Sequence, residues 1–238
     1  MRRIGISLLL VLFSLPAGAQ QHVTDVAVSG RVVECSPFAA RFFPGEFNYC
    51  LGRKLWEKRR YESAREMFEL AAGWGSKSAQ SVLGVVLFNG EGIRADRALG
   101  LAWLALAAER ENGFRRGVLA SALQQATPGE KAEADRLLHA MRQKYGDEVA
   151  AARADRRYRR EMASFRSNPV YGKGTCVSEW WGMMAPATSI NDPNALPISG
   201  CTLLSEERVA RKLEGRYAIY FAGWKGTVTV GESSPVRP

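Results

Sequence analysis

The sequence predicts a mostly α-helical protein of stacked helix pairs, with a small, disulfide-tied and partly β C-terminal module. Two observations predict the repeat. The pairs Leu51-Gly52 and Leu83-Gly84 lie 32 residues apart, and the pairs Ala71-Ala72 and Ala107-Ala108 lie 36 residues apart. The difference of four residues falls in the loop 89–93. A helix-turn-helix period of this length is typical of α-solenoids, which bind partners along an extended surface.

Four helices are expected in the two clearest repeats, at about 48–58, 61–73, 77–88 and 96–110. Each carries apolar residues at three- and four-residue spacing, the pattern of one buried helix face. Small residues in these segments allow helix axes to approach closely. Gly90 and Gly92 permit positive φ in the loop between the last two helices.

The segment 79–113 matches a known repeat pattern. The matching residues are Ala79-Gln80, Leu83-Gly84, the loop 89–93, Asp96, Trp103 and Ala107-Ala108. On these residues, 79–113 resembles a Sel-one-like repeat, a relative of the tetratricopeptide repeats. Ile93 replaces the usual valine, Gly100 replaces alanine, and Gly113 comes two residues late. A weaker unit covers about 47–78, and a degenerate one about 114–145. The resemblance implies an α/α-solenoid of two to three repeats that acts as a scaffold for other proteins.

Residues 1–19 predict a signal peptide with cleavage after Ala19. Arg2-Arg3 precede an apolar run, Ile4 to Leu15, and small residues follow. The run is about half of the ~20 residues that span a bilayer. No transmembrane segment is therefore expected after signal removal, and the mature protein is expected in the periplasm or outside the cell.

The mature chain divides into four expected segments. Residues 20–46 form a valine-rich strand and an irregular aromatic segment that caps the repeats. Residues 47–146 hold the repeats and a closing helix, which Thr127 begins with a capping box. Residues 147–166 form a basic helix. Residues 167–238 form the C-terminal module, with a helix at about 206–214, a β-hairpin at about 217–230 and a disordered tail.

The four cysteines are expected to form two disulfides, because the count is even and the chain is exported. Four cysteines permit three pairings, and proximity in the sequence favours Cys35–Cys50 and Cys176–Cys201. A metal site is the alternative, but it has no Cys-x-x-Cys and only His22 and His139 to contribute. We expect no metal and no cofactor.

Three features are candidates for binding. The surface of the repeats offers Trp74, Asn89, Arg94 and Arg97, and the basic helix offers Arg156, Arg157, Arg159 and Arg160. Trp180 and Trp181 lie within the second predicted disulfide loop. For each feature the alternative is packing or an ordinary solvated surface.

The net charge is +9 for the whole chain, with 33 basic and 24 acidic residues. The charge favours adhesion to anionic wall polymer or lipid, although it can also simply maintain solubility. Nucleic acid is not expected as a partner, because an exported chain does not meet it.

No catalytic motif of the serine hydrolases, zinc peptidases or phosphate-binding loops is present. The glycines of the 89–93 loop are better explained by a repeat turn, and His139 has no evident nucleophile as partner. The expected function is an exported, non-enzymatic scaffold or adaptor in a bacterial-type cell envelope, with a protein or peptide partner. One alternative is a cell-wall or polyanion binder that uses the basic helix and the tryptophans. Another is an unrecognised hydrolase in the C-terminal module.

Overall fold

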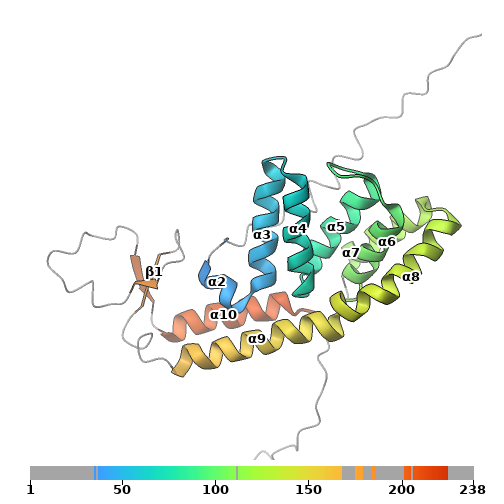
Figure 1. Ribbon diagram of the computed structural model, residues 1–238. Helices are drawn as coiled ribbons and strands as arrows, with labels where there is room; N and C mark the ends of the chain where they lie inside the picture. Colours follow the sequence, from blue (N-terminus) through green and yellow to red (C-terminus); the bar gives the residue numbers. More distant parts are fainter. Residues whose placement is uncertain are drawn as a thin grey trace, which may run out of the picture.

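The structure, a computed structural model, describes residues 35, 37–110, 112–167, 175–178, 184–185, 201–204 and 206–224. Most of these residues form α-helices that pack against one another (Figure 1). The helices are α2 (Pro37–Phe42), α3 (Pro44–Glu57), α4 (Tyr61–Gly73), α5 (Lys77–Asn89), α6 (Arg97–Ala107), α7 (Gly113–Gln125), α8 (Pro128–Tyr145), α9 (Asp147–Ser167) and α10 (Glu206–Tyr220). Across the described ranges, no helix combines the length and the apolar character needed to cross a membrane.

Helices adjacent in sequence pack as pairs, α3 with α4 and α5 with α6, and α6 also packs against α8. A glycine lies at the closest approach in each pair. A Cβ on Gly52 would lie 2.6 Å from the Phe68 ring, and a Cβ on Gly84 would lie 2.6 Å from Leu104. The absence of a side chain at these two positions therefore allows the helices of each pair to approach.

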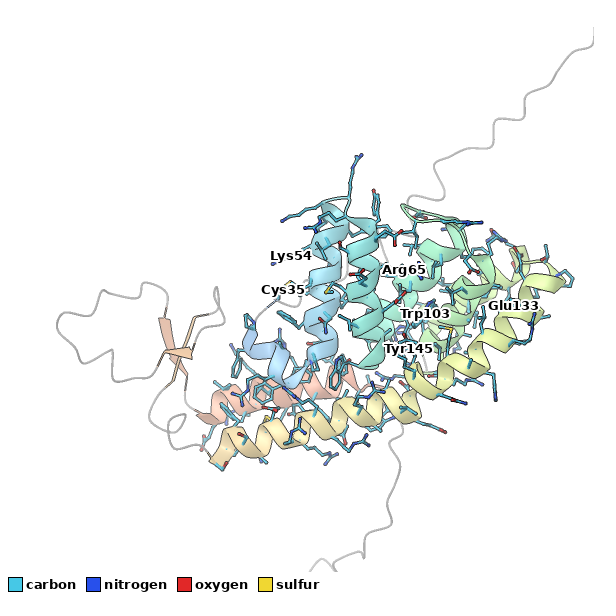
Figure 2. The ribbon with its side chains drawn as sticks, viewed as in Figure 1. Cys35, Lys54, Arg65, Trp103, Glu133 and Tyr145 are labelled. Carbon is cyan, nitrogen blue, oxygen red and sulfur yellow. A yellow bond between two sulfur atoms is a disulfide. The ribbon has the colours of Figure 1, made fainter. Side chains whose placement is uncertain are left out.

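The main core lies among α4, α5, α6 and α8. Phe68, Leu83 and Leu106 are completely or almost completely buried in it. Trp103 of α6 meets Tyr145 of α8 edge to face, with ring centroids 4.6 Å apart (Figure 2). This contact holds the end of α8 on the core of the preceding helix pairs.

Polar side chains cap the helices of this region. Ser76, Asp96, Asn112 and Thr127 each accept a hydrogen bond from the backbone N–H three residues later. Thr127 and Glu130 form the predicted capping box, and Pro128 occupies the first turn of α8. The start of α8 is thus fixed by its local sequence.

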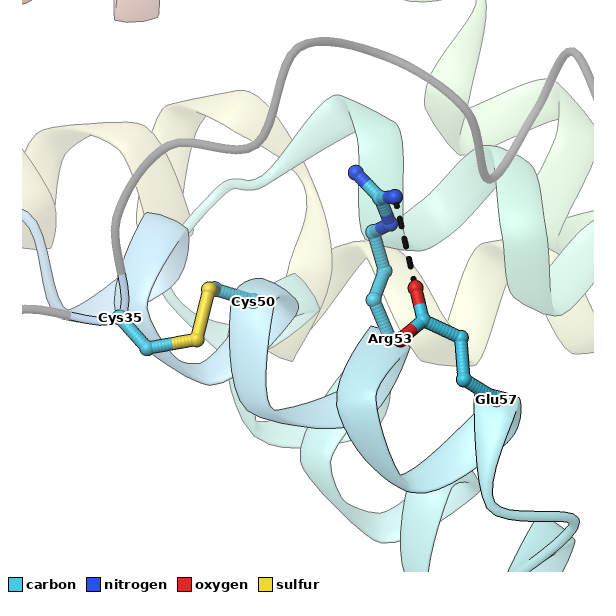
Figure 3. Close-up of a disulfide and its surroundings, with 4 residues drawn as sticks. All are labelled: Cys35, Cys50, Arg53 and Glu57. Atoms are coloured by element: carbon cyan, nitrogen blue, oxygen red, sulfur yellow. Dashed lines mark ion pairs between the residues drawn. A yellow bond between two sulfur atoms is a disulfide. The ribbon is translucent and has the colours of Figure 1, made fainter.

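The aromatic segment 38–47 was expected to be irregular, but all of it except Phe43 is helical, which corrects that prediction. Pro37 begins α2 and Pro44 begins α3, in the position where proline suits a helix. Phe42 and Phe43 lie in a buried cluster with residues of α9 and α10. The predicted disulfide Cys35–Cys50 is present, with a Cα–Cα distance of 5.4 Å, and it ties residue 35 to α3 (Figure 3).

The prediction of a short helix followed by a β-hairpin was wrong for residues 215–222. Helix α10 continues through Gly215 to Tyr220, and a turn follows. Val209 and Leu213 are buried at helical spacing, whereas Ile219 of the same helix is 77% exposed. The alternation of apolar residues fitted a strand equally well, but packing against the neighbouring helices decides for the helix.

Three short strands lie between α9 and α10 in the sequence. Strand β1 (Thr175–Ser178) pairs antiparallel with β2 (Met184–Ala185) and with β3 (Cys201–Leu204). The backbone places Cys176 opposite Leu203, and Cys201 opposite Ser178. The cysteine side chains are outside the described part, so the Cys176–Cys201 disulfide stays a prediction. The same holds for the strand in 20–34, the second hairpin strand and the tail.

Helices α9 and α10 lie side by side beneath α2, α3 and α4 (Figure 1). The Tyr217 hydroxyl of α10 donates to Asp155 of α9 at 2.7 Å, and the ring packs on Tyr158 with centroids 4.5 Å apart. An Arg166–Glu214 ion pair joins the same helices further along. Helix α10 is therefore packed on α9, and both helices share a buried cluster with Phe42 and Phe43 of the α2–α3 segment.

Two tyrosines in this contact are expected to respond oppositely to loss of the hydroxyl. Tyr158 is 7% exposed, and its hydroxyl has no hydrogen-bond partner among the described residues. Burial raises its pKa to about 12, with the charge of Glu214 adding to the shift. The Tyr220 hydroxyl donates to the carbonyl of Trp74 at 2.7 Å. Tyr158→Phe should raise the free energy of unfolding by about 1 kcal/mol, and Tyr220→Phe should lower it by about 1 kcal/mol. Urea unfolding measures both, and shifts of the same sign would refute this interpretation.

Candidate functional site

Two basic and two acidic side chains meet where α5 begins, α6 ends and α8 turns into α9. The Lys77 side chain is 2% exposed, and its Nζ lies 2.9 Å from Glu109 Oε2 and 3.1 Å from Asp147 Oδ1. It also donates to the carbonyl of Leu106 at 2.7 Å. Arg110, with its side chain 4% exposed, binds both carboxylate oxygens of Asp147, at 2.8 and 2.9 Å. We call Lys77, Glu109, Arg110 and Asp147 the ionic network.

The network also binds backbone carbonyls near the ends of helices. Arg110 donates to the carbonyl of Tyr220 at 2.6 Å and to that of Gly75 at 3.3 Å. Gln80, which is completely buried, donates to the carbonyl of Tyr145 at 2.9 Å and accepts from Lys77. Carbonyls at helix ends lack intrahelical partners and carry partial negative charge. The network therefore fastens the ends of α4, α8 and α10 to one point.

The ionic network is balanced in charge, and each of its cations has several partners. Burial lowers the pKa of the Lys77 amine, while the charges of Asp147 and Glu109 act in the opposite direction. Such a saturated cluster supports packing and presents no exposed base or nucleophile for chemistry. The ionic network could not be predicted from the sequence, because Lys77 and Asp147 are 70 positions apart and no local motif joins them.

Arg115 of α7 has a partly buried side chain. Its backbone N–H donates to the capping residue Asn112, but its guanidinium makes no hydrogen bond or ion pair among the described residues. Burial lowers the pKa of Arg115, and the charge of Arg110 lowers it further, whereas Asp147 and Tyr49 oppose the shift.

Helix α3 carries two polar side chains that are partly or largely buried, Tyr49 and Arg53. Tyr49 packs on Phe68 with ring centroids 5.8 Å apart, and burial raises the pKa of its hydroxyl against the charges of Arg53 and Arg115. Arg53 follows one helical turn later, with its side chain 11% exposed and 3.8 Å from the carboxylate of Glu57 (Figure 3). Packing on α4 therefore engages Tyr49, and an ion pair within α3 engages Arg53.

The residues predicted as contacts on the repeats are not brought together. Trp74 packs against Ala151 and the aromatic residues at the end of α10. Arg97 holds Glu130 at 2.9 Å, and its guanidinium lies 3.9 Å from the centre of the Phe88 ring. Packing thus explains both side chains.

The other two predicted contacts on the repeats lie near the 89–93 loop. Asn89 donates to Glu91 within that loop at 2.9 Å, and Arg94 is exposed. A binding role for Trp74, Asn89, Arg94 and Arg97 stays a prediction.

Most of the arginines in the basic helix are engaged with neighbouring groups. Arg157 donates to the carbonyl of Arg41 at 3.0 Å and lies 3.3 Å from Glu161. Arg159 binds Asp155 at 2.9 Å, and Arg160 lies 3.8 Å from Glu161. Arg156 is exposed. Ion pairs on the helix therefore compensate much of the charge that the sequence suggested for binding.

The remaining candidates are Trp180, Trp181, His139 and a metal site. Trp180 and Trp181 lie outside the described residues, and His139 is exposed on α8. No group of three or more metal-ligating side chains is arranged to hold an ion in the part of the chain that the structure describes. Comparison with family models, with curated proteins and with solved structures gave no match to this chain.

A buried carboxyl on α3 is expected to make stability depend on pH. Burial raises the pKa of Glu46 from 4.5 to about 6, against the charge of Arg216, and its Oε2 has no hydrogen-bond partner among the described residues. Because the folded pKa is above the unfolded value, the folded state binds the proton more tightly. The stabilisation is complete below the unfolded pKa, and it is lost as pH rises through the folded pKa.

Glu46→Gln is therefore expected to raise the free energy of unfolding by about 2 kcal/mol at neutral pH, and by much less at acid pH. Urea unfolding across the range between the two pKa values measures this difference. Glu57→Gln is the control, because its side chain is 63% exposed on the same helix. An equal gain at all pH values would show that the charge of Glu46 is not the cause.

Proposed function

We propose that the protein is a non-enzymatic scaffold or adaptor whose helical repeats bind a protein or peptide partner. The observation that carries the proposal is the repetition of one helix contact. Gly52 on Phe68 and Gly84 on Leu104 are the same kind of contact in two successive helix pairs, with the glycines 32 residues apart. Such repetition supports an α/α-solenoid of Sel-one-like repeats, a class of architecture that generally presents binding surfaces.

Helices α7 and α8 are consistent with a third, degenerate unit. Gly113 and Gly117 of α7 have no neighbour near the place of a Cβ, in contrast to the glycines of the first two pairs. Phe114 and Leu123 of the same helix are exposed large apolar residues. A loosely packed last repeat with apolar surface is a suitable place for a partner to add contacts.

The location that we propose is the periplasm or the exterior of the cell. The disulfide Cys35–Cys50 supports an oxidising compartment, where such bonds persist. The predicted signal peptide 1–19 supports export by its basic start, short apolar run and small residues. In protein recovered from a cell envelope fraction and digested with trypsin, the most N-terminal peptide should begin at Gln20, which follows Ala19 and not a Lys or Arg.

Binding of wall polymer or another polyanion is the weaker proposal, because Arg157, Arg159 and Arg160 lie in ion pairs with acidic side chains. Arg94 and Arg156 are exposed basic residues that remain suitable for such adhesion. Salt separates this proposal from the adaptor, because surface charge is strongly screened at about 1 M salt.

The test is a pull-down from envelope extract with the tagged mature chain, washed at about 0.15 M and then at about 1 M salt. An adaptor should retain one defined protein through both washes. The control bait is the same mature chain, unfolded by reduction and alkylation. This control should not retain the partner protein. Retention of anionic polymer or lipid alone, lost at high salt, would refute the adaptor and favour the polyanion binder.

A further inference from the structure

We propose that one edge of the helical repeats binds a membrane surface that carries anionic lipid headgroups. We call this the basic edge, and its residues are Lys54, Lys58, Arg59, Arg60 and Arg94. Lys54 lies in the last turn of α3, 58–60 form the turn into α4, and Arg94 lies in the loop before α6. The proposal goes beyond the adaptor function and does not depend on it, because it concerns a separate surface where the protein itself meets the envelope.

The first argument is that the two turns lie together. The loop 89–93 rests on Tyr61, the first residue of α4, since a Cβ on Gly92 would lie 2.7 Å from the Tyr61 ring. Arg60 directly precedes Tyr61, and Arg94 follows Gly92 by two residues. Both turns lie on the side of the molecule opposite α9 and α10 (Figure 1). Cations from two successive helix pairs therefore share one edge.

The second argument is that these cations are free. All five side chains are exposed, and none forms a hydrogen bond or ion pair with the residues that the structure describes. Three nearby acids are engaged in an ion pair, a hydrogen bond and a helix cap, namely Glu57, Glu91 and Asp96. A fourth, Glu62, lies in the first turn of α4, where the helix dipole stabilises negative charge. The basic edge therefore differs from α9, where acidic side chains pair with most of the arginines.

The third argument is the backbone of Arg59. Its φ is 58°, and it is the only residue other than glycine with a positive φ among the described residues. The N–H groups of Arg59 and Arg60 donate to the carbonyls of Trp56 and Leu55, the two hydrogen bonds of a Schellman motif. Glycine is favoured at this position, because a side chain in the left-handed region costs stability. An arginine there points to a role for its charge.

The exposure of the cations favours a surface as the ligand. The side chains extend from two turns at the outside of the molecule, so a plane of headgroups can meet several of them at once. Anionic lipids offer such a plane, and each Lys or Arg near it adds to the attraction. An anionic membrane is therefore the partner that fits the charge and the placement of the basic edge.

The test is sedimentation of the mature protein with phosphatidylglycerol vesicles, and with phosphatidylcholine vesicles as the neutral control. Each cation near an anionic membrane is expected to raise the partition coefficient about fivefold. A triple variant that replaces three cations of the basic edge should therefore bind phosphatidylglycerol about a hundredfold more weakly. Its substitutions are Lys58→Gln, Arg59→Gln and Arg60→Gln.

The matched control removes the same charge from three exposed arginines of α9. Its substitutions are Arg156→Gln, Arg159→Gln and Arg160→Gln. Since α9 lies on the opposite side of the molecule, the control should change binding less than about threefold, a residual effect of net charge.

Arg59→Gly separates binding from folding. Glycine suits the positive φ, so this variant should unfold at a higher urea concentration than the wild type. It should nevertheless bind phosphatidylglycerol vesicles about fivefold more weakly. Unchanged binding by this more stable variant would contradict a role for the Arg59 charge.

Four further outcomes would overturn the proposal. The first is binding to phosphatidylglycerol that does not exceed binding to phosphatidylcholine, and the second is an equal loss in the two triple variants. The third is tighter binding of the basic edge to an oligo-glutamate peptide than to vesicles, which would indicate an acidic protein. The fourth is displacement by inorganic phosphate beyond that by chloride at the same ionic strength, which would indicate a site for free anions. The vesicles contain no protein, so none of these outcomes bears on the adaptor function, which the pull-down tests separately.

Discussion

Replacing Asp147 with alanine is expected to lower the free energy of unfolding by about 3–5 kcal/mol. The Asp147 carboxylate binds Arg110 through both oxygens and lies 3.1 Å from Lys77 Nζ, in a cluster whose cations are almost inaccessible to solvent. Its removal leaves Arg110 buried without an acidic partner, and breaking a buried ion pair in this way costs about that much. Urea or guanidinium unfolding gives the value directly.

Glu148→Ala is the matched control for this prediction. Glu148 is the next residue, it is exposed, and it lies in the same first turn of α9, so it has a similar interaction with the helix dipole. It should cost less than about 1 kcal/mol. Similar losses for the two variants would mean that the ionic network contributes no more than the helix dipole does.

Gly100→Ala is expected to destabilise the protein by about 3 kcal/mol, although alanine normally favours a helix. A Cβ at this position would lie 2.6 Å from the Phe88 backbone nitrogen and 2.8 Å from the Gly84 carbonyl oxygen. These are backbone atoms, so α5 and α6 must separate to make room for the methyl group. Thermal or urea unfolding measures the loss.

Gly117→Ala is the matched comparison, because this substitution is expected to raise the free energy of unfolding instead of lowering it. Gly117 lies within α7, and no atom comes within 4 Å of the place of its Cβ. Alanine there should stabilise the protein by about 0.5–1 kcal/mol through its helix propensity. A gain at Gly100 as well would show that the close approach of α5 and α6 is not present in solution.

The four helices predicted within 48–110 and the closing helix α8 were predictable, because their apolar residues recur at helical spacing and the start of α8 is set by a local cap. Thr127 and Glu130 show this most clearly, since the four-residue signature alone fixes the start of α8. Gly100, a departure from the repeat pattern that the segment resembles, is explained only by the structure. There is no space for a side chain between α5 and α6.

The errors lie where long-range packing decides. Tyr217, Ile219 and Phe221 alternate like a strand, but contacts with α9 hold Tyr217 in helix α10 and Phe221 in the turn after it. The ionic network could not be predicted, because it joins positions 77, 109, 110 and 147 through the packing of several helices.

Hydrogen exchange of the protein alone and with the partner retained in the pull-down tests the central proposal most directly. We expect binding to slow amide exchange in peptides from the helix pairs α3–α4 and α5–α6, which form the repeats. Slowed exchange confined to α9, with these four helices unchanged, would contradict binding on the repeats and place the partner on the basic helix.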